Sequence, residues 1–549
     1  MSSHDVCIVG LGPTGLTLAH LLARRGLSVI ALERDPEFYG MARAVYTDDE
    51  CLRILQNAGV ADELHAQMNT GSVVQWRHAD GSVLAQFHNP DEPHGWPVSN
   101  FLYQPFFEGT LEARLADHPQ VTVRRGCVVT GFTQDGDGVT VMTTGETVRA
   151  SFLVGADGGR STIRRELGIE MDGKAFPQRW LVIDLKAKDG TDPFRHLPYF
   201  DFVCDPDLPT VSCPQPDRRH RFEFMLKDSD ATEEFEAVET AHRLMGRYLD
   251  GDQVEIARQL VYTFNALVAQ RWREGRVLLA GDAAHMTPQF IGQGMNAGIR
   301  DADNLSWKLA TIVRHGASAS ILDSYQAERK PHAKAMIDLS VFNKDIVSTQ
   351  SRAAIRARDV GLGIGVKVPG LASFITEAKM KPKPRLKPGY LGLPRALPRL
   401  KRGVEGSLMP QPRVRTYAGT CVRMDDALGH GWVVLGIGCD PREVVTDTAW
   451  DELDATWGAF YLPGTRPQGQ PLIEERGHHS LVEVRGTSLE TRELVDLEGL
   501  DHALVPWLRR ARAATGHVIV LRPDKYVFSV TGPGQHPRAA DAAREQLGL

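Results

Sequence analysis

The chain has 549 residues, of which 42% are hydrophobic and 24% charged, the composition of an ordinary globular protein with roughly two to four domains. Its formal net charge of −6 offers no strongly basic face, so we expect neither nucleic acid nor an anionic membrane as a partner. The chain also lacks a run of about 18 apolar residues and enters a strand directly, which predicts a cytoplasmic protein without a membrane span or secretion signal.

The first elements in chain order form a βαβ unit around a glycine-rich turn. An apolar strand, Val6 to Val9, leads into the segment GLGPTG, and a helical pattern follows from Leu16 to Arg25. Gly10 allows a tight turn, Gly12 lets the backbone approach a pyrophosphate, and Gly15 permits close packing of the helix on the strand. The pyrophosphate of a dinucleotide would then lie at the positive end of the helix.

The next strand, Val29 to Leu32, is followed by Glu33, eighteen residues beyond Gly15. An acid at this place accepts a hydrogen bond from a ribose hydroxyl and repels a 2′-phosphate. The bound nucleotide should therefore carry a free ribose diol, as FAD and NAD do. A glycine-rich turn without a ligand is the alternative.

The first 175 residues continue to alternate between helical and strand patterns. Apolar residues recur at helical spacing over 48–57 and 104–115, and the segments 121–123 and 139–142 alternate like strands. A doubly wound sheet requires this alternation, so we assign residues 1–175 to the first part of a dinucleotide-binding domain.

From residue 176 the pattern changes to short strands. The runs 180–186, 200–204 and 221–226 are bounded by Pro, Asp and Gly. They predict a separate domain over 176–270 that is built on an antiparallel sheet.

The chain then returns to the first domain. An apolar strand at 276–280 and long helical stretches over 294–315 and 322–344 form its second part, 271–385. The segment 386–411 is rich in Pro, Gly and Lys and is interpreted as a linker.

The last segment, 412–549, has strand patterns at 432–435 and 517–521 with helical stretches between them, which predicts a separate α/β domain. The seven cysteines of the chain form no CxxC pair and no zinc-ligand spacing. We therefore expect free thiols and no metal site.

Two further motifs can contribute to the same dinucleotide site. In GADGGRS, Asp157 beside Gly158 can accept hydrogen bonds from cofactor hydroxyls, and its alternative role is to cap the helix predicted over 160–167. In GDAAH, Asp282 follows a strand and can bind a diol. The turn 292–298 offers backbone N–H groups to the electron-rich edge of a flavin.

These motifs carry a resemblance that extends over essentially the whole chain. With DGGRSTIRR from Asp157, RFEFM from Arg221 and GDAAHMTPQFIGQGMNAGIRDADNLSWKLA from Gly281, the chain resembles the class A FAD-dependent aromatic hydroxylases, which are flavoprotein monooxygenases. The resemblance implies an α/β fold: a Rossmann-like FAD-binding domain, an inserted antiparallel β-sheet substrate domain and a C-terminal thioredoxin-like domain. That last domain lacks CxxC here, because Cys439 stands alone.

The resemblance also implies the chemistry. NADH or NADPH would reduce bound FAD, and the reduced flavin would activate O2 as a C4a-hydroperoxide whose distal oxygen is transferred to a phenolic ring, in the degradation of aromatic compounds. The expected partner is a small phenolic substrate, and the expected assembly is a homodimer.

Three alternatives remain open at the level of sequence. A nitrocatechol-type monooxygenase would replace a nitro group and release nitrite. An FAD reductase or dehydrogenase would not transfer oxygen at all. A module without enzymatic activity would use the C-terminal domain as a docking surface.

The resemblance assigns cofactor contacts residue by residue. Arg43 should approach the flavin or the pyrophosphate, and Gln104 matches a position that touches the cofactor. The full set of expected cofactor-binding residues is Gly10, Gly12, Gly15, Glu33, Arg34, Arg43, Gln104, Asp157, Gly158, Asp282, Pro288, Gly294, Met295 and Asn296.

Three residues are candidates for catalysis or substrate binding. Asp48 could activate the phenol or orient the substrate, and its alternative role is to cap the following helix. Arg221 could pair with a substrate carboxylate, or it is an outward charge alternating with buried Phe222 and Phe224. His285 either takes part in the chemistry or is a structural residue at the flavin end. The sequence does not identify the base that deprotonates the phenol.

Overall fold

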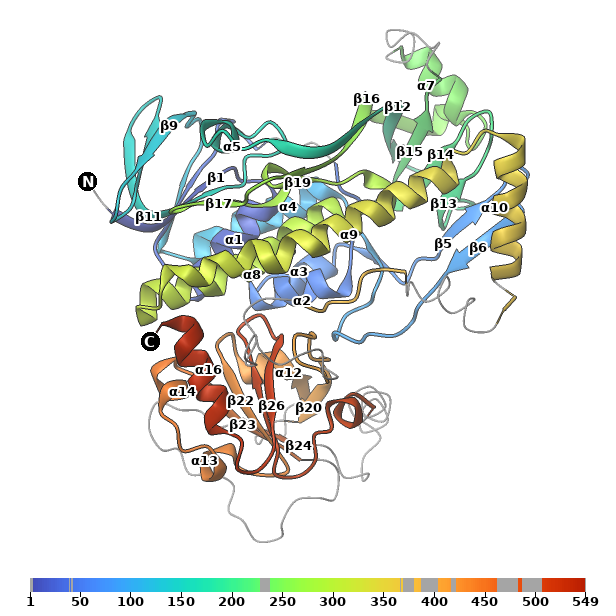
Figure 1. Cartoon of the computed structure of the whole chain (residues 1–549). Helices are drawn as coiled ribbons and strands as arrows, with labels where there is room; N and C mark the ends of the chain where they lie inside the picture. The colour runs from blue at the N-terminus through green and yellow to red at the C-terminus, as the bar shows by residue number, and fades with distance from the viewer. Residues whose placement is uncertain are drawn as a thin grey trace.

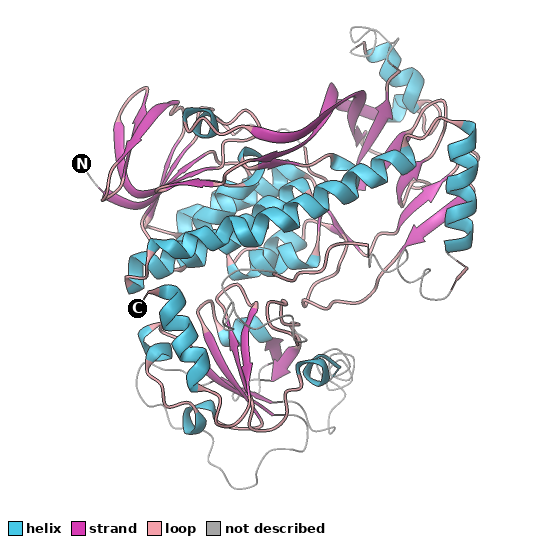
Figure 2. Ribbon diagram, viewed as in Figure 1, coloured by secondary structure: helices cyan, strands magenta, loops and turns pink. Residues whose placement is uncertain are grey.

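In the computed structural model, the described residues form three large β-sheets with helices packed around them, together with a small sheet of order β3-β7-β4 (Figure 1) (Figure 2). No helix among these residues is long and apolar enough to cross a lipid bilayer. The short strands of the small sheet are β3 (Tyr46–Thr47), β4 (Asn69–Thr70) and β7 (Asn100–Phe101). The described residues are 3–38, 40, 43–227, 237–365, 367–368, 380–386, 403–415, 421–461, 482–485 and 506–548.

The first large sheet is the Rossmann-like sheet that the sequence predicts, with strand order β17-β18-β11-β1-β2-β8. The five strands from β18 to β8 run parallel, while β17 pairs antiparallel with β18 and the hairpin of β9 and β10 extends β11. The central strands are apolar and fully buried, as parallel strands covered on both faces require. The bounds are β1 Ser3–Val9, β2 Val29–Leu32, β8 Val121–Arg124, β9 Val129–Gln134, β10 Val139–Thr143, β11 Thr147–Gly155, β17 Arg273–Glu274 and β18 Val277–Leu279.

Helices cover this sheet, and most of them follow the predicted ranges. Helix α1 begins three residues earlier than predicted, because Pro13 occupies the first helical position, where its fixed φ angle suits a helix. Helix α8 has the predicted bounds, and α9 follows it along the length of the molecule (Figure 1). The bounds are α1 Pro13–Arg24, α2 Asp49–Asn57, α3 Ala61–His65, α4 Gln104–Arg114, α5 Thr162–Glu166, α8 Gly294–His315 and α9 Asp323–Val347. Helix α10 (Arg352–Gly365) lies instead beside the second large sheet (Figure 1).

The second large sheet has strand order β19-β16-β12-β15-β14-β13-β5-β6. It differs from the sequence prediction in three ways: β5 and β6 come from the first 175 residues, β19 comes from beyond residue 270, and β13 pairs with β5 in parallel. Strands β12 and β16 are long and run from the Rossmann-like sheet to the far end of this second sheet (Figure 1). The bounds are β5 Val74–Arg77, β6 Val83–Phe87, β12 Met171–Ala187, β13 Phe200–Val203, β14 Thr210–Gln215, β15 Arg219–Met225, β16 Val254–Ala269 and β19 His285–Met286.

Alternation along β15 gives the second sheet two different faces. Phe222 and Phe224 are fully buried and pack with Leu181 and Ile183 of β12 and with helix α7 (Val238–Met245). Arg221 and Glu223 therefore point to the opposite face, because successive side chains in a strand alternate. That face looks toward the Rossmann-like sheet.

The third large sheet belongs to the C-terminal part and has strand order β21-β20-β24-β23-β22-β25-β26. Its central strands β24, β23 and β22 are parallel, and β25 and β26 continue it antiparallel. Residues 387–402 of the predicted linker lie outside the described residues, and the thioredoxin-like interpretation stays a prediction. The bounds are β20 Arg413–Arg415, β21 Cys421–Arg423, β22 Val433–Ile437, β23 Thr456–Tyr461, β24 Val482–Arg485, β25 Val518–Leu521, β26 Val527–Thr531, α12 Met424–Leu428, α13 Pro441–Val444, α14 Ala449–Glu452 and α16 Pro537–Leu547.

Buried ion pairs join this C-terminal unit to the helices of the first domain. Arg522 contacts Glu328 of α9 at 2.7 Å and also pairs with Asp524, and Lys308 of α8 lies 3.0 Å from Glu328. Arg53 of α2 forms a second buried pair with Asp425, at 2.6 Å. All of these side chains are almost completely shielded from solvent.

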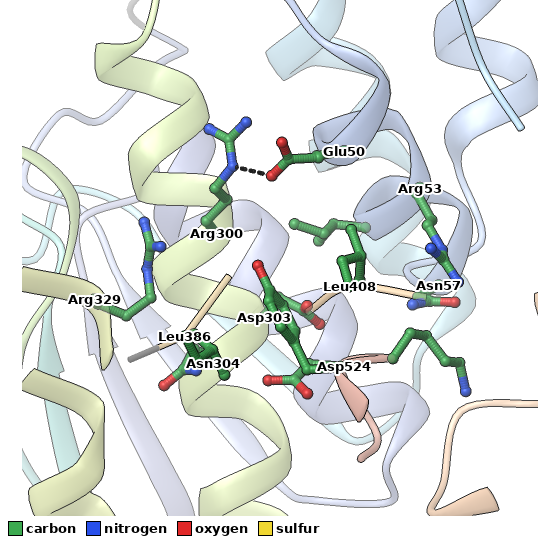
Figure 3. Close-up of a pocket in the computed structure, with 13 residues that line it drawn as sticks. Glu50, Arg53, Asn57, Arg300, Asp303, Asn304, Arg329, Leu386, Leu408 and Asp524 are labelled. Atoms are coloured by element: carbon green, nitrogen blue, oxygen red, sulfur yellow. Dashed lines mark hydrogen bonds and ion pairs between the residues drawn. The ribbon is translucent and has the colours of Figure 1, made fainter. Parts of the chain in front are cut away.

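A small cavity lies within this joint, among charged side chains of α2, α8, α9 and the C-terminal unit (Figure 3). Its volume of about 30 Å³ can hold water but no aromatic substrate. Figure 3 shows Arg300 paired with Glu50 on one side of it and Asp303 beside Asp524 on another. The joint is therefore a packed ionic contact between two parts of the chain.

Candidate active site

The three glycine-containing motifs lie together at one edge of the Rossmann-like sheet. Strand β1 pairs in parallel with β11, and β11 pairs in parallel with β18, so that Val9, Gly155 and Leu279 lie side by side. One motif follows each of these strands. Because the carboxyl ends of adjacent parallel strands open at the same edge, three segments far apart in sequence form one site.

The loops are packed closely enough to require glycine. Gly10 has a φ of +102°, and a Cβ on it would overlap the carbonyl oxygen of Ala156 in the second motif. A Cβ on Gly15 would overlap the carbonyl oxygen of Gly10, and one on Gly281 of the third motif, whose φ is +61°, would overlap the hydroxyl of Thr14 in the first. The first loop thus touches both of the others.

A cavity of about 300 Å³ opens between these loops and the second sheet. This volume is within the range of small-molecule and cofactor sites. The cofactor-facing part of its lining includes Gly12, Pro13, Thr14, Arg43, Gln104, Gly158, Asp282, Gly294 and Met295.

Polar groups around the cavity fit a dinucleotide. The first turn of α1 has no side-chain cap, so its N–H groups are available to a pyrophosphate. Glu33 is held in place because its carboxylate accepts hydrogen bonds from the N–H groups of Leu11 (2.8 Å) and Asp35 (3.0 Å). Asp157 caps α5 through one carboxylate oxygen, while the other is buried without a partner among the described residues. A ligand hydroxyl would satisfy that oxygen.

Gln104 lines the cavity, whereas Pro288 and Asn296 lie behind the lining and Arg34 lies at the surface. The Gln104 side-chain oxygen accepts the N–H groups of Arg43 and Ala44, so it also positions the loop that carries Arg43. Pro288 and Asn296 are buried beside the lining, and Asn296 donates to the carbonyl of Gly292 at 2.7 Å. The Arg34 side chain is 71% exposed and does not line the cavity.

The second sheet supplies the opposite wall, on which Arg221 is buried and not outward. Its guanidinium makes two contacts with Asp184 of the neighbouring strand β12, at 2.6 and 3.0 Å, and donates to the carbonyl of Arg43 at 2.6 Å. The alternative of a solvated sheet charge is therefore wrong. Arg258 of β16 approaches the same Asp184 carboxylate at 3.8 Å.

Glu223 is the ionisable residue of this wall that sequence reasoning missed. It lies between Val182 of β12 and Val211 of β14, faces the cavity, and accepts a hydrogen bond from the side-chain amide of Gln289. Burial raises the pKa of Glu223 to about 7, and Arg221 offsets this effect only in part. Its position in RFEFM, two residues from Arg221, is the signal that could have identified it.

An apolar side pocket, which we call the annex, continues the cavity away from the cofactor loops. It has a volume of about 170 Å³ and shares Phe200, Phe202, Gln289 and Phe290 with the main cavity. The rings of Trp76 and Phe202 stack at 5.4 Å between centroids, as do those of Phe101 and Phe200. The site therefore combines the three loops, a wall that carries the buried acid Glu223, and an aromatic annex.

Sequence comparisons agree with this arrangement. A family model described as an FAD binding domain matches residues 3–340, and one described as the HcaD C-terminal domain matches residues 406–546. The 3-(3-hydroxy-phenyl)propionate/3-hydroxycinnamic acid hydroxylase of Paraburkholderia xenovorans (strain LB400) is 34% identical over 97% of this chain and 89% of its own length. The protein with the same description in Mycobacterium sp. (strain KMS) is 35% identical over 98% and 90%. The chain belongs to the FAD-dependent aromatic hydroxylases.

Solved structures share the fold of the hydroxylase. A ternary complex of aklavinone-11 hydroxylase with FAD and aklavinone has a TM-score of 0.76 at 23% identity and covers 100% of both chains. The p-nitrophenol 4-monooxygenase PnpA from Pseudomonas putida DLL-E4 has a TM-score of 0.62 at 25% identity, covering 69% of this chain and 98% of its own. The predicted α/β fold class is confirmed.

Asp48 of the hydroxylase is a helix cap inside an ionic cluster. One of its carboxylate oxygens accepts the N–H of Cys51 at 3.0 Å, and the other contacts Arg300 at 2.5 Å and Lys381 at 2.9 Å. These partners keep the pKa of Asp48 well below its usual range, although burial alone would raise it. The capping role is thus present, and a role in catalysis stays a prediction.

His285 of the hydroxylase is completely buried beneath the third loop. Its Nε2 lies 2.7 Å from a carboxylate oxygen of Asp301, which in turn is held by Arg329 at 2.9 Å. Its backbone pairs with Val268 of β16, which connects the third loop to the second sheet. This geometry favours the structural role over the chemical one, which stays a prediction.

Proposed function

We propose that the hydroxylase inserts one oxygen atom of O2 into a phenolic ring and uses NADH or NADPH as the reductant, with the second oxygen atom leaving as water. Bound FAD supplies the electron transfer and the oxygen activation. The observation that carries the proposal is the cavity itself, in which loops suited to a flavin dinucleotide face an aromatic wall with a buried acid.

The cofactor roles follow from the placement of the loops. Glu33 would bind a ribose hydroxyl, Asp157 and Asp282 would bind ribose or ribityl hydroxyls, and the first turn of α1 would bind the pyrophosphate. The N–H groups at the start of α8, near Gly294, line the cavity and would stabilise negative charge on a flavin ring bound there.

Glu223 is proposed to accept the phenolic proton. In its ionised form a carboxylate oxygen takes the proton from the substrate hydroxyl, which leaves a phenolate whose ring is more electron-rich. Gln289 donates to the Glu223 carboxylate and keeps it oriented toward the cavity.

Charges on the wall support this transfer. Before it, the guanidinium groups of Arg221 and Arg258 are balanced by the carboxylates of Asp184 and Glu223. After the proton transfer, the negative charge lies on the phenolate and Glu223 is neutral, so the total charge of the site does not change. Moving a negative charge within a balanced, buried site costs less than creating a new one there.

The proposal is tested with the purified holoenzyme and a panel of phenols. We expect NADH or NADPH oxidation that depends on the phenol, with a hydroxylated product in proportion to the nicotinamide consumed. Oxidation that yields only hydrogen peroxide with every phenol would favour a reductase, and release of nitrite from nitrophenols would favour replacement of a nitro group.

A further inference from the structure

The annex is large enough for part of a substrate. A dry cavity of about 150 Å³ admits a benzene ring, and the annex has about 170 Å³. Its walls are mainly aromatic and aliphatic side chains. Trp76 stacks on Phe202 and Phe101 stacks on Phe200, while Phe200 and Phe202 meet edge to face. A hydroxylated ring in the main cavity could therefore extend an apolar substituent into this space.

The polar side chains that line the annex already have partners within the protein. Trp76 donates to Asn343 at 2.9 Å, and Asn343 donates to the carbonyl of Phe290 at 2.6 Å. Tyr46 donates to the carbonyl of Val98 at 2.9 Å, and Gln293 donates to Asp48 at 3.1 Å. A polar substituent placed there would lose its water and gain no equivalent bond.

The cations of the lining are likewise engaged by acids. Lys381 lies 2.9 Å from Asp48 and 3.2 Å from Glu50. Arg300 pairs with the same two acids, so the two negative charges of this cluster balance its two positive charges. Arg221 is engaged by Asp184.

Arg43 is a further cation that lines the main cavity, at its cofactor end. Arg43 is close enough to Asp282 of the third loop for their charges to interact. A substrate carboxylate at Arg221 or Lys381 would therefore have to displace an acid that is already paired with that cation in the interior, which is costly. Arg43 and Asp282 are exposed at the cofactor end of the main cavity, and neither lines the annex.

We infer that the preferred substrate is an uncharged phenol whose apolar body, such as a second ring or a short alkyl chain, occupies the annex. The inference rests on the proposed function and makes it more specific. It separates this chain from the 34–35% identical relatives, whose names state a phenylpropionate, a compound that carries a carboxylate.

The first test compares ligands that differ in charge. The dissociation constants of 3-(3-hydroxyphenyl)propionate, its methyl ester and 3-hydroxybiphenyl are measured with the oxidised holoenzyme from the change in flavin absorbance. We expect the ester and the biphenyl to bind at least about tenfold more tightly than the acid, the equivalent of about 1.4 kcal/mol. Equal or tighter binding of the acid would overturn the inference.

This measurement needs no turnover, so it decides the inference separately from the proposed function. If the uncharged phenols bind tightly but none is hydroxylated, the proposed function fails and the binding preference stands. If phenols are hydroxylated but the acid is preferred, the inference fails and the function stands.

The second test fills the annex. Val74 of β5 lines it, and Val74→Trp should weaken binding of 3-hydroxybiphenyl at least about tenfold while phenol binds as before. The matched control is Val83→Trp on the adjacent strand β6, where the side chain is 53% exposed and does not line the annex. Unchanged binding of the biphenyl to a folded Val74→Trp variant would place its second ring elsewhere and overturn the inference.

Discussion

Glu223→Gln should reduce hydroxylation and at the same time stabilise the protein above neutral pH. The amide keeps the shape of the carboxyl and its place beside Gln289, but it cannot accept the phenolic proton. A positioned general base contributes about 10²- to 10⁴-fold to rate, so we expect a loss of that size in product formation. The holoenzyme should retain its FAD, because Glu223 lies on the wall opposite the cofactor loops.

The pH dependence follows from the raised pKa. The base works only when ionised, so hydroxylation by the natural protein should rise with pH through about 7, and the Gln variant should lack this rise. The assay is the initial rate of hydroxylated product from about pH 5 to about pH 9, with enough nicotinamide to saturate.

Stability should change in the opposite direction. A carboxyl whose pKa is 4.5 in the unfolded chain and about 7 in the folded protein favours folding only while it is protonated. The penalty develops as pH rises from 4.5 to about 7 and then reaches about 3 kcal/mol. The free energies of unfolding of the two proteins should therefore be similar near pH 4.5 and diverge in favour of the variant by about pH 8.

Glu255→Gln, at an exposed position of strand β16 in the same sheet, is the matched control and should change neither quantity. The reasoning would be refuted by a Glu223→Gln variant that keeps the natural rate and pH profile. A variant that is less stable than the natural protein at about pH 8 would refute the assigned burial cost.

Three further predictions concern the cofactor, the joint and Asp48. Gly15→Ala should yield protein with little bound FAD, measured as flavin absorbance per chain, because the added methyl group would overlap the Gly10 carbonyl. The control variant Gly109→Ala, which has open space around the added methyl group, should keep its FAD. Arg522→Met leaves two buried acids without their main cation and should lower the free energy of unfolding by about 3–5 kcal/mol. An unchanged midpoint of urea unfolding would show that these ion pairs do not stabilise the protein. Asp48→Ala should slow hydroxylation while FAD content stays intact, and unchanged turnover would remove Asp48 from the catalytic residues.

The amino-acid sequence alone predicts the features that depend on local residue patterns or on specific motifs. The βαβ unit around Gly10, the bounds of α8 and the burial of Phe222 and Phe224 all follow from spacing and apolar periodicity. The convergence of the three motifs was predictable because each comes directly after a buried strand of one parallel sheet.

Features that depend on distant pairing were not predictable. The parallel contact of β5 with β13 joins segments more than a hundred residues apart, and neither strand carries a sign of its partner. Glu223 has the alternation of an exposed strand position, and only the tertiary structure shows that both faces of β15 are covered. The engagement of Arg221 by Asp184 has the same origin, because pairing of β12 with β15 brings them together.

The shared length of β12 and β16 limits how this enzyme can acquire new substrates. Both strands pass without interruption from the cofactor edge to the substrate wall, apart from local shifts in their pairing. One residue inserted into β12 between Trp180 and Val182 would shift the rest of the strand by one position. The side chains of Val182 and Asp184 would then point away from the cavity, and the apolar side chains next to them in the strand would point toward it. Adaptation is therefore expected to proceed by exchange of individual side chains, while changes in chain length are confined to the loops.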